Sequence, residues 1–141
     1  MTRIDFHSNV PDKMGYACRL VRKAFAAQCR IVLLAEDKDS VAALDTALWT
    51  FSELDFLPHV VASDPLALQT PIILTDNDAT DYPHHQILIN LSSRTPAHFA
   101  RFERMFEIIS SGDADKQSGR DRYRFYQQRG YPLTHTVAEQ A

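Results

Sequence analysis

The residues with the clearest chemical potential lie near the end of the chain, in the segment KQSGRDRYRFYQQRGY over 116–131. On a helix, residues spaced three and four apart share one face. This spacing aligns a basic and aromatic stripe of Lys116, Arg120, Tyr123 and Gln127, with Arg124 beside it. Guanidinium groups bind carboxylates through paired hydrogen bonds, and tyrosine adds a flat apolar surface. The stripe therefore predicts a site for an acidic peptide.

The distribution of charge leaves two alternatives to peptide binding open. Residues 116–130 carry five cations and one anion, a net charge of +4, whereas residues 36–81 carry ten acidic side chains and one lysine, a net charge of −9. Aromatic and cationic side chains together also suit single-stranded DNA. A solvated helix that binds nothing is the second alternative. Because the positive charge is local and the whole chain has a net charge of −3, we expect direct contact with nucleic acid to be weak or absent.

A second candidate surface is the apolar stretch LDTALWTFSELDFLPH over 44–59. Its large side chains are Trp49, Phe51, Phe56 and Leu57. Several large apolar residues in an irregular segment are typical either of the centre of a protein interface or of the hydrophobic core. The residues alone leave both interpretations open.

The segment ILTDNDAT over 73–80 is the strongest indication of catalysis. Asp76 and Asp78 follow a predicted strand, as the nucleophile and the proton donor do in magnesium-dependent phosphatases of the haloacid dehalogenase type. The pair Asp113 and Asp115 would supply the distant acidic partners, although its spacing is narrower than in those enzymes. A solvated acidic loop is the favoured interpretation. We therefore expect no catalytic residues, no metal and no cofactor.

The pattern of apolar residues predicts one domain over 1–141 with a three-layer α/β fold, in which helices flank a mainly parallel sheet. The fold is expected to be Rossmann-like without a nucleotide-binding loop, because no glycine-rich phosphate motif follows a strand. No apolar run is long enough to cross a membrane, and we expect a cytoplasmic protein. Strands are predicted over 3–10, 29–37, 60–62, 71–76 and 86–92 and near 107–109, and helices over 14–27, from 37–40 to 49, from 93–96 through Phe99, Phe102 and Met105, and over 116–129.

Several of these segments, taken in order, resemble one protein family. They are LDTALWTFSELDFLPH, PIILTD, QILINLSS, FERMFEII and RYRFYQQRGYPL. Together they resemble the chi subunit of the bacterial DNA polymerase III holoenzyme (the HolC family), from the first strand to about Leu133. The resemblance implies a non-catalytic accessory subunit of the clamp-loader assembly. It implies two partners, the psi subunit, which connects chi to the clamp loader as a heterodimer, and the acidic C-terminal tail of single-stranded-DNA-binding protein.

The same resemblance assigns both candidate surfaces to these partners. By position, Lys116, Arg120 and Tyr123 would bind the tail, above an apolar floor formed by Ile109, and Arg124 extends the same stripe. The tail ends in a phenylalanine with a free carboxylate after several aspartates, which suits a cationic site with an apolar floor. The psi subunit would contact Trp49 and Phe56 together with their neighbours Phe51 and Leu57.

Overall fold

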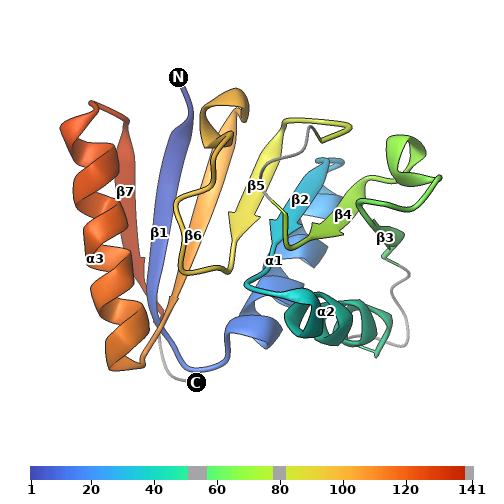
Figure 1. Cartoon of the computed structure of the whole chain (residues 1–141), viewed down its shortest axis with the longest axis horizontal. Helices are drawn as coiled ribbons and strands as arrows, with labels where there is room; N and C mark the ends of the chain where they lie inside the picture. The colour runs from blue at the N-terminus through green and yellow to red at the C-terminus, as the bar shows by residue number, and fades with distance from the viewer. Residues whose placement is uncertain (51–56, 78–81, 139–141) are drawn as a thin grey trace.

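A computed structural model describes residues 1–50, 57–77 and 82–138 of the chain. The described residues form a three-layer α/β domain with one seven-stranded sheet (Figure 1). The order of the strands is β3-β4-β2-β5-β6-β1-β7, and every pair of neighbouring strands is parallel. This architecture confirms the predicted fold class.

The strands are β1 (Arg3–Val10), β2 (Ile31–Leu34), β3 (His59–Val61), β4 (Ile72–Thr75), β5 (Ile87–Asn90), β6 (Arg104–Ser110) and β7 (Leu133–Val137). The helices are α1 (Lys13–Ala26), α2 (Lys38–Thr50) and α3 (Asp113–Gln128), with short 3₁₀ helices at Ala67–Gln69 and Phe99–Arg101. The central strands β2, β4 and β5 are buried at every position, as expected for parallel strands that are covered on both faces.

Two apolar layers hold the helices against the sheet. On one face, α1 and α2 contribute Ala17, Val21, Leu44 and Leu48 to a layer with alternate side chains of the strands. On the other face, α3 packs through Tyr126 against residues that include Phe6, Met105 and Ile109. The helix α3 covers the part of the sheet that contains β6, β1 and β7 (Figure 1).

The predicted helix through Phe99, Phe102 and Met105 is wrong. The segment contains one 3₁₀ turn, Phe99–Arg101, and Met105 already lies within β6. A spacing of three residues matches a helix, but Phe99 and Phe102 instead fill the layer beneath α3. Glu107 interrupts the apolar pattern of β6, yet it is fully buried, and Arg122 and Tyr126 of α3 donate hydrogen bonds to its carboxyl group. The strand continues past this polar residue because β6 pairs with both β1 and β5.

The sequence analysis did not predict β7. Its residues are exposed except for the half-buried Leu133, so the strand lacks a buried apolar pattern. It forms because it pairs with β1 over Ile4–Ser8 and extends the sheet at one edge. The final helix begins at Asp113, three residues before the predicted start, and Gly130 follows its end with a φ of 79°, a conformation that favours glycine.

Within the described ranges, none of the helices is both long and apolar enough to span a bilayer.

Candidate functional site

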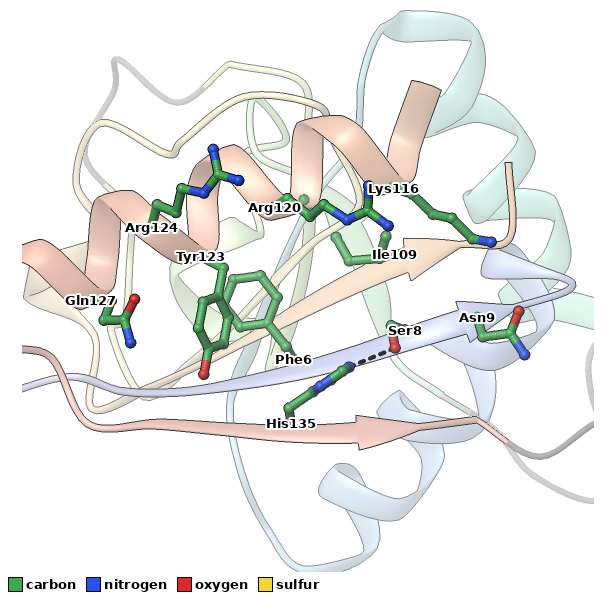
Figure 2. Close-up of a pocket in the computed structure, with 11 residues that line it drawn as sticks. Phe6, Ser8, Asn9, Ile109, Lys116, Arg120, Tyr123, Arg124, Gln127 and His135 are labelled. Carbon is green, nitrogen blue, oxygen red and sulfur yellow. Dashed lines mark hydrogen bonds between the residues drawn. The ribbon is translucent and has the colours of Figure 1, made fainter. Parts of the chain in front are cut away.

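The basic face of α3 lines a groove of about 550 Å³ between the helix and the sheet (Figure 2). All five residues of the predicted stripe lie along it: Lys116, Arg120, Tyr123, Arg124 and Gln127. Ile109, the predicted apolar floor, lies in the groove as well. The structure therefore brings together the residues that the sequence analysis assigned to one binding site.

The floor of the groove is apolar and closely packed. The ring of Tyr123 lies edge-on to Phe6 of β1, with 5.0 Å between the ring centroids. Ile109 comes from β6 and is 4% exposed. The helix passes directly above it at Gly119, where a Cβ atom would lie only 2.7 Å from Cδ1 of Ile109. Gly119 thus allows α3 to approach the sheet closely, and the basic side chains extend beside this contact.

The three cations of the groove have no partner among the described residues. None of these residues forms an ion pair or a hydrogen bond with the side chains of Lys116, Arg120 or Arg124. Arg129 differs, because its guanidinium group stacks 3.6 Å above the ring centroid of Phe125, outside the groove. The groove therefore combines available positive charge with an apolar floor, and this chemistry suits an anion that carries an apolar group.

Sequence reasoning missed the part of the groove that β1 and β7 supply. Phe6, Ser8 and Asn9 come from β1, and His135 comes from β7. Nε2 of His135 lies 2.6 Å from the hydroxyl oxygen of Ser8, so these two side chains are hydrogen-bonded across neighbouring strands (Figure 2). Asn9 has a φ of 57°, a conformation in which asparagine is enriched. The only sequence signal for Phe6, Ser8 and Asn9 was the strand pattern of 3–10, which says nothing of what packs beside it, and no pattern indicated His135.

A buried polar network fixes the orientation of α3. Nε of Arg122 donates to Glu107 at 3.1 Å, and the hydroxyl of Tyr126 donates to the same carboxylate at 2.6 Å. Both Arg122 and Glu107 are almost completely buried. Burial raises the pKa of Glu107, while the charge of Arg122 and the hydrogen bonds to the carboxylate act in the opposite direction. Because Arg122 and Tyr126 face the sheet, Arg120 and Arg124 are left on the groove side of the helix.

The second predicted surface is only partly within the described residues. Trp49 is 51% exposed near the end of α2, and its ring lies 4.4 Å from that of His59 between centroids. Leu57 is 3% exposed and belongs to the hydrophobic core, so it does not contribute to an exposed surface. Phe51 and Phe56 lie outside the described residues.

The acidic residues of the phosphatase hypothesis do not converge in the described part of the chain. Asp76 follows β4, whereas Asp113 and Asp115 follow β6, three strand spacings or about 14 Å away along the sheet. Asp115 accepts a hydrogen bond from the backbone N–H of Ser110 at 2.7 Å and pairs with Lys13 at 3.1 Å. Its carboxylate therefore has a structural role at the start of α3. Asp78 lies outside the described residues.

Comparisons with known proteins agree with one another. A family described as "DNA polymerase III chi subunit, HolC" matches residues 1–134. A protein named DNA polymerase III subunit chi from Pseudomonas aeruginosa is 32% identical over 137 residues, which cover 94% of each chain. Proteins of the same name from Haemophilus influenzae and Escherichia coli are 23% and 24% identical. These two matches cover 84% and 82% of this chain and 82% and 79% of the relatives.

Proposed function

Because the chain belongs to the DNA polymerase III chi subunit family and so has an accessory role in DNA replication, we propose that it connects the polymerase to single-stranded-DNA-binding protein. In this proposal, the groove beneath α3 binds the acidic C-terminal tail of single-stranded-DNA-binding protein. The surface around Trp49 binds the psi subunit, which connects the protein to the clamp loader. The protein acts by binding and carries out no catalysis.

The observation that supports the tail-binding proposal is the position of three cations, without partners among the described residues, beside an apolar floor. A tail that ends in phenylalanine presents a ring, a terminal carboxylate and the aspartates before it. The ring fits against Ile109, Phe6 and Tyr123, where it loses contact with water. The carboxylates lie within reach of Lys116, Arg120 and Arg124, whose charges are not neutralised by described acidic residues.

The first prediction is that Arg120→Ala weakens binding of a synthetic ten-residue peptide with several aspartates and a C-terminal phenylalanine. Loss of a hydrogen bond between charged groups costs about 1.5–3 kcal/mol, so we expect the affinity to fall roughly ten- to hundredfold. Isothermal titration calorimetry measures this change. Arg120 is exposed, and the thermal unfolding temperature should remain that of the wild-type protein.

Arg129→Ala is the matched control, because it removes the same charge from the end of the same helix but outside the groove. Its affinity for the peptide should remain within about twofold of the wild-type value, since an exposed charge outside the site contributes little. Equal losses in both variants would indicate a general effect of charge and would remove the groove as the binding site. A single-stranded oligonucleotide that bound more tightly than the peptide would favour the DNA alternative.

A further inference from the structure

The outer edge of β7 is an open hydrogen-bonding edge that runs beside the groove. The backbone N–H of Ile4 donates to Pro132 at 3.0 Å, and that of Ala138 donates to Ser8 at 2.8 Å. Because Ile4 lies opposite Leu133, these two hydrogen bonds show that the backbone N–H and C=O groups of the even-numbered residues of β7 point toward β1. The N–H and C=O groups of Leu133, His135 and Val137 therefore point away from β1. No other strand of the described residues pairs with this side.

The sequence of β7 lacks the features that usually protect an exposed edge strand. Strand edges are commonly blocked by a charged side chain, a proline or a bulge, because an open edge pairs with other chains. The strand LTHTV contains neither a charged residue nor a proline, and its register with β1 is regular throughout. Val137 is 58% exposed. Within the described part of the chain, the edge is therefore open to an additional strand.

The groove and the open edge form one continuous surface. His135 lines the groove through its side chain and belongs to the edge through its backbone (Figure 2). From Lys116 to Gln127 the helix rises by about 16 Å. Five residues of an extended chain cover about the same length, which matches the five residues of β7.

We propose that the edge of β7 binds its ligand by strand addition, so that an extended acidic peptide becomes the eighth strand of the sheet beneath α3. This inference rests on the proposed function of the groove. Lys116, Arg120 and Arg124 have no described partners, so their positive charge is complementary to an acidic peptide. Peptides that add to a sheet edge gain affinity from backbone hydrogen bonds and specificity from side-chain pockets. Here Tyr123, which lines the groove together with His135, supplies the apolar side-chain contact, and Leu133, His135 and Val137 supply the backbone groups.

The position of the cations also sets the direction of the added strand. Lys116 lies near Asn9, at the carboxyl end of β1, and Gln127 lies toward the opposite end (Figure 2). A peptide whose terminal carboxylate lies between Lys116 and Arg120 therefore runs parallel to β7. All the other strand pairs of the described sheet are parallel as well.

The test compares His135→Pro with His135→Ala, using the same synthetic acidic peptide. Both variants lose the imidazole ring and its hydrogen bond to Ser8, but only proline removes the outward N–H group. Because this group does not bond to β1, proline at the edge keeps the pairing of the sheet. We expect His135→Pro to bind the peptide at least about fivefold more weakly than His135→Ala, which corresponds to about 1 kcal/mol. Equal affinities would overturn strand addition.

A second measurement leaves the protein unchanged. Methylation of one backbone nitrogen at a time along the peptide should weaken binding to the wild-type protein at alternate positions, because alternate amides of an added strand face β7. Uniform affinity across the series would overturn the inference even if His135→Pro failed to fold. Sedimentation of the free protein provides another check. If the protein forms a dimer that the acidic peptide does not dissociate, a second copy of the chain occupies this edge and the inference is wrong.

The two proposals fail in different ways. If Arg120→Ala loses the peptide while His135→Pro equals His135→Ala, the groove binds the tail without strand addition. If the wild-type protein does not bind the peptide, both proposals are wrong.

Discussion

At the scale of single residues, the basic side chains of α3 have two distinct roles. Arg120 and Arg124 line the groove without described partners, whereas Arg122 is 3% exposed and pairs with the fully buried Glu107. All three are arginines on one helix at intervals of two positions, and the helical turn of about 100° per residue decides which of them faces the sheet. Charge alone therefore does not identify a binding residue, because burial separates the structural arginine from the others.

We expect Arg122→Ala to destabilise the fold by about 3–5 kcal/mol, because it leaves the carboxylate of Glu107 buried without its charged partner. Urea denaturation followed by circular dichroism measures the free energy of unfolding. The double variant Arg122→Met with Glu107→Leu removes both charges and should recover part of this loss, although the buried hydroxyl of Tyr126 then lacks its acceptor. A loss below about 1 kcal/mol in Arg122→Ala would show that the ion pair contributes little to holding α3 in place.

At the scale of elements, the groove depends on the close approach of α3 to β6. Gly119 permits this approach, since its missing side chain leaves room for Ile109. A glycine inside a helix normally costs about 1 kcal/mol relative to alanine. At position 119, the close packing of α3 against β6 offsets the low helix propensity of glycine.

Gly119→Ala should therefore weaken peptide binding without unfolding the protein. The new methyl group displaces the Ile109 side chain, which alters the floor of the groove, while the gain in helix propensity of about 1 kcal/mol offsets the local repulsion. We expect about a fivefold lower affinity by calorimetry and a free energy of unfolding within about 1 kcal/mol of wild type. Gln117→Ala, on an exposed part of the same helix, should leave the affinity unchanged. Wild-type affinity in Gly119→Ala would show that the floor does not contact the peptide.

At the scale of the whole molecule, the two candidate surfaces lie toward opposite edges of the sheet. The groove lies beside β7, and α2, which carries Trp49, packs against β3 and β4. The edge strands β3 and β7 are separated by six strand spacings, or about 29 Å. In the proposed function, this arrangement separates the surface for the psi subunit from the groove for the acidic tail.

We therefore expect the two surfaces to be energetically independent, because distant sites with no shared partners behave additively. Trp49→Ala and Phe56→Ala should reduce co-purification with the psi subunit while the affinity for the acidic peptide stays within about twofold of wild type. Arg120→Ala should have the reverse effect. Retention of psi by both aromatic variants would exclude this surface as its binding site, and a change of peptide affinity in these variants would indicate coupling across the sheet.

The sequence alone determined the fold class and the composition of the basic stripe on α3. Continuous apolar runs such as those of β2, β4 and β5 are typical of a sheet covered on both faces, and the spacing of Lys116, Arg120 and Tyr123 already aligns them on a helix. Both patterns are local, so neither needs information about distant residues.

The tertiary structure decided what lies opposite that stripe. In the folded protein β6 is a strand despite Glu107, because Arg122 and Tyr126 of α3 and Asn90 of β5 all donate hydrogen bonds to its buried carboxyl group. In addition, an exposed segment forms β7, His135 and Ser8 line the groove, and Leu57 lies in the hydrophobic core rather than on a surface. These features arise from contacts between residues that are far apart in the chain, and periodicity along the sequence does not encode such contacts.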